Sequence, residues 1–321
     1  MHSIKTIVVG VEMPESRPWS AANIAPANRQ AVRQSFDVAD AMNAAVRLIC
    51  VLPEASAGFL GSEEDARAEA ETDQAAAMKV LADLEVQHMG KTSRPVDVSS
   101  VVAFGQAWFE ILKVAGTDKN NMIVCGTRNK GTVARLLFGS TGRKLLRNAA
   151  CPVWLLKPRI DDDADLDVLA ATDLSEVGED VLHVGVALGQ SLPVRLNVLH
   201  VVNDDLDRHM ARTGVSEEEL EDYRRESKED AEKTLQEQLA MTDYRTVARG
   251  VQTHIAEGAA DGCILSAIEE LDIDLLIMAT SGRGGIPGML FGNTAERLLP
   301  ELPCSLLAIK PDDFVCPVAL D

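Results

Sequence analysis

The chain repeats one plan twice, and this internal duplication limits what it can fold into more than any other feature. GSTGRKLLRNAACPVWLLKP at Gly139–Pro158 returns as GNTAERLLPELPCSLLAIKP at Gly292–Pro311, 153 residues later (292 − 139). NMIVCGTR at 121–128 returns as DLLIMATS at 274–281 with the same offset. The openings IKTIVVGVEMPES and LDVLAATDLSEVG also correspond. The 321 residues therefore hold two similar domains of about 150 residues each.

Each copy alternates short, β-branched apolar runs with longer amphipathic stretches. The runs of the first copy are TIVVGV, VRLICVL, DVSSVVA, NMIVCG and PVWLLK, and those of the second are DVLAATD, VRLNVLHVV, VQTHIAE, DLLIMAT and SLLAIK. Strands that are apolar throughout and alternate with helices indicate a parallel sheet covered on both faces. We therefore predict an α/β fold with two tandem, doubly wound, five-stranded parallel-sheet domains of the Rossmann-like kind, each with four helices.

The predicted domain boundaries follow from the repeat. The first domain spans 1–158 and the second spans 168–314, with a C-terminal tail at 315–321. Between the domains, 159–167 has the sequence RIDDDADLD, which is better explained as a solvated acidic linker than as a metal-binding tract.

Charge is unevenly shared between the two halves. Residues 1–157 carry 18 Lys and Arg against 16 Asp and Glu, whereas residues 158–321 carry 13 against 34, for a net charge of −19. So acidic a second half argues against binding to nucleic acid or to an anionic membrane. No run of about 18 apolar residues and no signal segment is present, and the six cysteines form no CxxC pair. We expect a cytoplasmic protein with free thiols.

The stretch CGTRNKGTVARLLFGST at 125–141 lies between the fourth predicted strand and the last predicted helix of the first copy. Backbone N–H groups in a glycine-rich turn, and at a helix N-terminus, can bind a phosphate without obstruction by side chains. Gly139 would allow close approach, and Ser140 and Thr141 would add hydroxyl groups. Four cations lie nearby: Arg128, Lys130, Arg135 and Arg143. A turn that binds no ligand explains these glycines equally well.

Motifs for catalysis are absent from the sequence. The histidines make no HxH or HxxxH spacing, no GxSxG elbow occurs, and no cysteine has the flanks of a nucleophile. We expect His200 to be a partly buried structural residue, and Trp108 and Trp154 to lie in the core. The chain is therefore predicted not to be an enzyme.

The matched blocks resemble a known family. The opening strands that end in an acid (VVGVE and LAATDLS), the CGTRNKG…GSTGRKLL…CPVWLLK block and the ATSGRGGIPGMLFGNTAERLL…LLAIKP block are similar to the universal stress protein family, in a tandem two-domain form of the UspE type. The resemblance covers nearly the whole chain. It implies domains that are adenine nucleotide alpha hydrolase-like, with ATP or another adenine nucleotide as a candidate cofactor and Mg²⁺ as a candidate companion of that nucleotide.

The family's nucleotide pattern is Gly, two residues, Gly, nine residues, then Gly followed by Ser or Thr, with an Asp at the end of strand one that reaches the adenine side. The first copy departs from it through Asn129 at the middle glycine and Glu12 at the acid, and the second through Ala279 at the first glycine and Asn293 at the serine. The candidate cofactor-binding residues of the first copy are Glu12, Gly126, Thr127, Asn129, Gly139, Ser140 and Thr141. Those of the second copy are Asp173, Val201, Ala279, Thr280, Gly282, Gly292, Asn293 and Thr294.

Neither copy is clearly the better site. The set of Asp173, Gly282 and Gly292 favours the second copy, and the nearby cations favour the first. Three functions stay open: a stress-response protein that binds an adenine nucleotide, a nucleotide-free scaffold that binds a protein or an apolar small molecule, and a weak ATPase or autophosphorylating protein.

The resemblance also implies how domains associate. Family members pair through the last strand, so PVWLLK and SLLAIK are predicted to lie edge to edge as an intrachain pseudo-dimer. A protein partner of unknown identity and a homodimer of the whole chain are further candidates.

Overall fold

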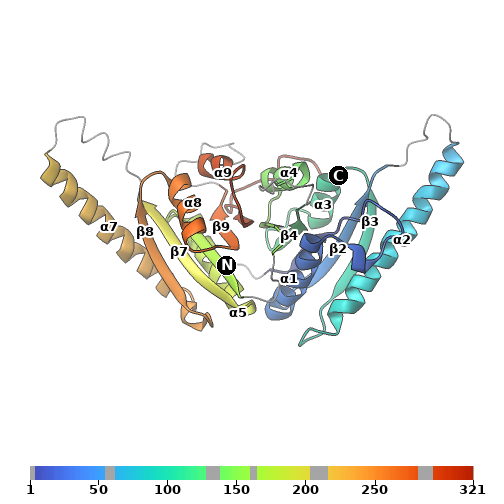
Figure 1. Ribbon diagram of the computed structural model, residues 1–321, viewed down its shortest axis with the longest axis horizontal. Helices are drawn as coiled ribbons and strands as arrows, with labels where there is room; N and C mark the ends of the chain where they lie inside the picture. Colours follow the sequence, from blue (N-terminus) through green and yellow to red (C-terminus); the bar gives the residue numbers. More distant parts are fainter. Residues whose placement is uncertain are drawn as a thin grey trace. The chain divides into compact units, whose positions relative to one another are not determined.

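A computed structural model describes residues 4–54, 62–127, 138–159, 165–202, 216–280 and 292–320. Its contacts divide the chain into two compact units (Figure 1). The first unit contains His2–Asp162 together with Asp313–Asp321, and the second contains Asp163–Asp312. The C-terminal segment, which we predicted as a separate tail, therefore groups with the N-terminal unit.

The first unit is built on five parallel strands. They are β1 (Thr6–Gly10), β2 (Ala45–Leu52), β3 (Val98–Phe104), β4 (Asn121–Gly126) and β5 (Val153–Leu156). Their order in the sheet is β3-β2-β1-β4-β5. Gly10 on β1 is in register with Ile49 on β2 and with Cys125 on β4, so the carboxyl ends of these parallel strands lie at the same edge of the sheet.

Helices cover both faces of this sheet. α1 (Pro26–Met42) packs with α2 (Glu63–Met89), and α3 (Ala107–Ala115) packs with α4 (Ser140–Asn148). A short 3₁₀ helix at Ala21–Asn23 contacts α2. From β1 the chain continues to β2 and β3 on one side of the sheet, and it then returns to β4 on the other side of β1. The strand order therefore reverses between β1 and β4, and the carboxyl ends of these two strands form a topological switch point.

The second unit repeats this arrangement. Its strands are β6 (Leu166–Thr172), β7 (Val194–Val202), β8 (Val251–Glu257), β9 (Leu275–Ala279) and β10 (Ser305–Ile309), in the order β10-β9-β6-β7-β8. Its helices are α5 (Glu176–Ser191), α7 (Glu217–Ala240), α8 (Ala260–Glu270) and α9 (Asn293–Leu298), with a 3₁₀ helix at Tyr244–Thr246. β6 begins at Leu166, inside the segment that we predicted as linker.

The inner strands are buried along most of their length because helices cover both faces of each sheet, whereas the edge strands β3 and β8 are partly exposed. Val8 and Val9 on β1 have no exposed surface, and neither do Leu275 and Leu276 on β9. The predicted α/β class with two parallel sheets is confirmed. Each unit is described by itself, so the pairing of PVWLLK with SLLAIK stays a prediction. No helix in the described ranges is long and apolar enough to cross a membrane.

The two units differ most in how the first strand connects to the first helix. In the second unit, residues 173–175 make this connection, whereas residues 11–25 make it in the first. Arg17, on the longer connection, forms ion pairs with Glu69 and Asp73 on α2 and lies over the Trp19 ring at 5.4 Å. The longer connection is therefore fixed to the helix beside it.

Candidate functional site

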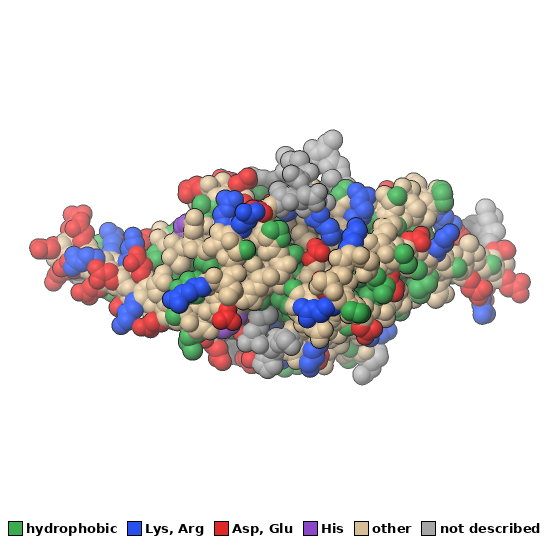
Figure 2. Space-filling model, turned by 90° about the horizontal axis from the view of Figure 1, so that it is seen from below, with side chains coloured by type: hydrophobic (Ala, Val, Ile, Leu, Met, Phe, Trp, Pro, Cys, Tyr) green, Lys and Arg blue, Asp and Glu red, His purple; other side chains and the backbone are tan. Residues whose placement is uncertain are grey.

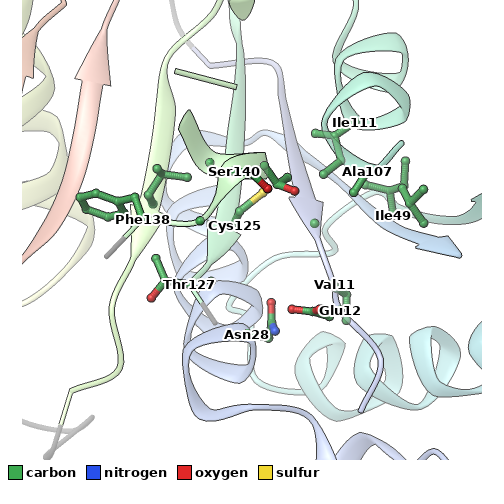
Figure 3. A pocket seen from close by; sticks show the side chains of 17 residues that line it. Val11, Glu12, Asn28, Ile49, Ala107, Ile111, Cys125, Thr127, Phe138 and Ser140 are labelled. Atoms are coloured by element: carbon green, nitrogen blue, oxygen red, sulfur yellow. The ribbon is translucent and has the colours of Figure 1, made fainter. Parts of the chain in front are cut away.

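A cavity of about 410 Å³ opens at the switch point of the first unit (Figure 3). This volume lies within the range of about 300–1,000 Å³ that is usual for small-molecule sites. The cavity lies between the carboxyl ends of β1 and β4, the first turn of α1, and the N-terminal ends of α3 and α4. The lining residues that sequence reasoning predicted are Glu12, Gly126, Thr127, Gly139, Ser140 and Thr141.

Polar side chains gather on one side of the cavity. Glu12 follows the end of β1, and Asn28 lies in the first turn of α1, and their side chains point toward one another (Figure 3). Asn28 is only 2% exposed. The sequence analysis missed this residue, although a polar residue in the first turn of a helix that starts at the carboxyl edge of a sheet is a usable signal.

Thr127 directly follows β4 at the wall of the cavity. Its backbone N–H donates to the Leu156 carbonyl at 2.7 Å, which anchors the end of β4 to β5. Its hydroxyl oxygen is buried, with almost no accessible surface, and has no hydrogen-bond partner among the described residues. This hydroxyl therefore faces the protein interior and not the open cavity.

The two predicted glycines of this site have different physical roles. A Cβ at Gly126 would lie 2.5 Å from the Ala27 carbonyl carbon, so this glycine allows α1 to pass close to β4. A Cβ at Gly139 would meet no atom within 4 Å, and the φ of this residue is −63°. Neither protein packing nor backbone conformation requires a glycine at position 139. Open space beside it would admit a ligand.

The N-terminus of α4 faces the cavity without its own cap. Gly139 is the N-cap residue and has no side chain that could accept from the first N–H groups, and no acid lies in the first turn. Arg143 and Arg147 follow on the same helix and are exposed. Free N–H groups and the helix dipole both favour an anion at this position.

Apolar residues form the rest of the wall. Ile49, Val51, Ala107, Ile111 and Leu155 line it, and Phe138 completes it. The Lys157 ammonium lies 4.8 Å from the centroid of the Phe138 ring. The cavity can therefore hold a flat or apolar group next to an anionic one.

The two thiols near the cavity are not nucleophiles. Burial raises the pKa of the Cys125 thiol, which lines the cavity, to about 12. Burial, helped by the negative charge of Glu12, raises the pKa of the Cys50 thiol to about 12 as well. Both thiols are protonated at neutral pH, and thiols react as thiolates.

At the corresponding position of the second unit, the acid is already engaged. The Asp173 carboxylate accepts from the Ser175 N–H at 3.0 Å and from the Ser175 hydroxyl, while that hydroxyl caps α5 by accepting from the Gly178 N–H at 3.2 Å. A Cβ at Gly178 would lie 2.8 Å from the Asp173 carboxylate. Asp173 therefore belongs to the local cap of α5.

The described residues at the corresponding end of the second unit bond to one another. The Thr280 hydroxyl donates to the Ile309 carbonyl at 3.2 Å, and the Gly292 N–H donates to the Thr280 carbonyl at 2.5 Å. α9 is only six residues long, and Glu296 stands in its first turn where the first unit has Arg143 (143 + 153). An acid in the first turn disfavours a second anion there.

The remaining predicted residues are placed as follows. Val201 lies near the end of β7 and is partly exposed, Ala279 ends β9, and Asn293 and Thr294 begin α9. Asn129 and Gly282 lie outside the described residues, as do Arg128, Lys130 and Arg135.

Side chains suited to catalysis or metal binding do not converge in the described ranges. No group of three His, Cys, Asp or Glu side chains that could hold a metal ion occurs there. His200 donates from Nδ1 to the Thr172 carbonyl at 2.9 Å, which is the structural role that we predicted. Trp154 is 1% exposed, as predicted, but Trp108 is not a core residue. It is partly exposed between α3 and α4, where the Lys144 ammonium lies 4.9 Å from its ring.

Comparisons with known proteins agree with this architecture. The universal stress protein family matches the chain twice, over residues 4–157 and 167–310. Universal stress protein E of Photorhabdus laumondii is 26% identical over 232 residues, which are 70% of this chain and 72% of that protein. Universal stress protein E of Escherichia coli K12 is 23% identical over 244 residues, or 71% and 72% of the two chains.

Solved structures show the same fold over nearly the whole length. A protein of Pseudomonas aeruginosa UCBPP-PA14 described as a universal stress protein superposes with a TM-score of 0.67 at 21% identity, covering 97% of this chain and 95% of that one. A universal stress protein from Archaeoglobus fulgidus gives a TM-score of 0.58 at 17% identity, covering 94% and 98%. The chain therefore belongs to the universal stress protein family, with two family domains in tandem, and is similar to universal stress protein E.

Proposed function

We propose that this chain is a stress-response regulatory protein that binds one adenine nucleotide, ATP or ADP, in the cavity of the first unit. The observation that carries the proposal is the N-terminus of α4, where Gly139 leaves open space at the cavity, Ser140 and Thr141 line it, and no acid lies in the first turn. Phosphate oxygens are strong acceptors for the N–H groups at such a helix terminus.

The cavity fits the two ends of a nucleotide. The N–H groups at the start of α4 and the hydroxyls of Ser140 and Thr141 would bind phosphate oxygens. The apolar side chains of Val11, Ile49, Val51, Ala107 and Ile111 would hold the base, and the neighbouring side chains of Glu12 and Asn28 would offer it hydrogen bonds. Mg²⁺ would enter with the phosphates, because the described residues of the cavity contain only one carboxylate, that of Glu12.

A stoichiometry of one nucleotide per chain follows from the contrast between the units. The charge at the fourth residue after the N-cap glycine changes sign, from Arg143 in the first unit to Glu296 in the second. The Gly292 N–H is also already bonded to the Thr280 carbonyl. Both differences favour an anion in the first unit only.

Regulation explains the site better than catalysis does. No histidine lines the cavity among the residues that the structure describes, and its one cysteine is protonated at neutral pH. Binding without a general base or nucleophile suits a protein whose partners change with its nucleotide state. A weak ATPase is the alternative, and it would need a group outside the described residues.

The first experiment is mass spectrometry of the protein denatured directly after native purification. Near-stoichiometric ATP or ADP would support the proposal. Gly139→Val should then remove the bound nucleotide, because its side chain would enter the open space beside the α4 N-terminus. Gly292→Val is the matched control in the second unit and should leave the nucleotide bound.

The opposite results would reject the proposal. If no nucleotide is released and ATP with Mg²⁺ gives no thermal shift, the chain is a nucleotide-free scaffold. Loss of nucleotide from Gly292→Val alone would transfer the site to the second unit. Phosphate release from ATP above the level of the Gly139→Val, Gly292→Val double variant would show the weak ATPase.

A further inference from the structure

α2 has a second apolar face that is partly or largely exposed among the described residues of its unit. Its core face consists of Ala77, Val80, Leu81 and Leu84, which are buried. Three of the large hydrophobic side chains that the described surface exposes also lie on this helix: Met78 at 37%, Val86 at 75% and Met89 at 45%. With roughly 100° per residue, these three project on the side of the helix away from the core face.

Small side chains extend this face into a continuous stripe. Ala68, Ala75 and Ala82 are exposed and fall on the same side as Met78 and Val86. We call Ala68, Ala75, Met78, Ala82, Val86 and Met89 the α2 stripe. It runs along most of the helix, and Glu71 is the one charged residue within its arc.

The duplicated domain shows what this face looks like when it is only solvated. α7 aligns with α2 at an offset of 154, which superposes the capping residues Ser62 and Ser216 and the core residues Leu81 and Leu235. At this offset, Ala68, Ala75, Met78 and Ala82 correspond to Asp222, Glu229, Glu232 and Gln236. One copy therefore keeps this face polar and the other keeps it apolar.

The surface view agrees with this contrast. Asp, Glu, Lys and Arg side chains dominate the end of the second unit that α7 forms, whereas hydrophobic side chains reach the surface at several places on the unit that contains α2 (Figure 2). Solvent alone does not account for an apolar stripe on a helix whose duplicate is charged at the same positions.

We propose that the α2 stripe binds the α2 stripe of a second copy of this chain, with the two helices antiparallel across a two-fold axis. Two flanking charges argue for this occupant. Arg67 and Glu85 are 18 residues apart (85 − 67), which is about five helical turns, so they lie on the same flank of the stripe near its two ends. An antiparallel two-fold brings Arg67 of each copy to Glu85 of the other.

The centre of such a pair is suited to close approach. The midpoint between Arg67 and Glu85 is residue 76, next to Ala75, the small residue of the stripe at this level. Small residues at a crossing let two helices approach, while Met78 and Met89 adapt their shape to the partner. Arg67 pairs with Glu71 at 3.1 Å within one chain, and in the pair it would contact Glu85 of the second copy as well.

Sedimentation velocity of the full chain, from about 1 to about 200 µM, tests the proposal. The wild type should change from monomer to dimer over this range. Met78→Glu, which installs the residue found at the same place on α7, should weaken dimerisation at least about 100-fold because it buries a carboxylate twice. Gln87→Glu adds the same charge to an exposed position of α2 off the stripe and should leave the dimer intact.

A charge reversal tests the orientation. Arg67→Glu and Glu85→Arg should each weaken the dimer, and the two changes together should restore it, because the ion pair re-forms with its partners exchanged. Each variant should keep the circular dichroism spectrum of the wild type, since these residues are not buried. A chain that stays monomeric at all concentrations, or a dimer that ignores Met78→Glu, would overturn the proposal. Weakening without restoration in the double variant would overturn the antiparallel arrangement.

Discussion

Gly126 lies where α1 passes the end of β4, and its replacement by alanine tests the packing that places the cavity. An added Cβ would lie 2.5 Å from the Ala27 carbonyl carbon, 2.6 Å from the Asn28 nitrogen and 2.7 Å from the Ala27 oxygen. Ordinary contact begins at 3.4 Å, so the start of α1 must retreat by about 0.9 Å (3.4 − 2.5). The atoms belong to the backbone, and no rotamer change can relieve the clash. We therefore expect Gly126→Ala to lower the free energy of unfolding of the first unit by about 2–3 kcal/mol, which is the upper part of the range for overpacked cores.

Tryptophan fluorescence isolates this effect. All three tryptophans, Trp19, Trp108 and Trp154, belong to the first unit, so their emission during urea or thermal unfolding reports that unit alone. A loss of this size should lower its Tm by about 4–12 °C. Ala279→Gly is the matched change in the second unit and should leave the tryptophan transition where it is. An unchanged midpoint for Gly126→Ala would refute the close approach of α1 to β4.

Three further outcomes follow from the structure. Thr127→Val should not lower the unfolding free energy of the free protein, because the Thr127 hydroxyl has no described partner to lose. Thr280→Val should instead cost about 1 kcal/mol of unfolding free energy through the lost bond to Ile309, and it should leave calorimetric titrations with ATP unchanged. Hydrogen bonds from the backbone N–H and the hydroxyl of Ser93 hold the pKa of the Asp40 carboxyl below its usual value. The contribution of these bonds to the free energy of unfolding is therefore present above pH ~3.9 and is lost as the pH falls through the lowered pKa. Asp40→Asn should destabilise the protein at pH ~7 and make no difference in urea titrations at pH ~2. Alkylation followed by peptide mass spectrometry should label the partly exposed Cys263 and Cys316 long before Cys50 and Cys125. Cys50 and Cys125 have pKa values of about 12, raised from the ordinary 9.0, and therefore hold about a thousandfold less thiolate than an unperturbed thiol. Rapid labelling of Cys125 would contradict its burial.

The strands were predictable because nothing competes with the pattern that encodes them. Runs such as NMIVCG and DLLIMAT are apolar throughout, and only a sheet buried on both faces uses them in that way. The predicted and observed bounds agree within a residue or two for β4 and β9. β6 begins earlier than predicted because the acidic character of the linker continues into the strand, where Asp167 interacts with Arg195 at its edge.

The site was harder to predict, since its parts come from elements far apart in the sequence. Gly126 and Gly139 fit one motif, yet the structure shows that α1 packing requires the first and leaves the second without a packing role. A motif cannot distinguish these two reasons for a glycine. Asn28 belongs to no motif and was missed, and Trp108 was expected in the core because the run beside it is apolar. Trp108 instead lies near the surface, at the N-terminal end of α3.

The two long helices extend beyond the parts of their sheets that bury them. α2 has no buried residue before Ala77, and α7 has none before Ala231, so capping boxes and local pairs maintain their first halves, helped on α2 by the ion pairs of Arg17 with Glu69 and Asp73. These segments should exchange their amide hydrogens fastest and be the first cut by trypsin, at Arg67 in one and at Arg224, Arg225 or Lys228 in the other. Cleavage there would leave both five-stranded sheets whole. If two chains pair through α2, this end is shielded while the end of α7 stays open, so the order of the two cuts would report whether the chain is alone or paired.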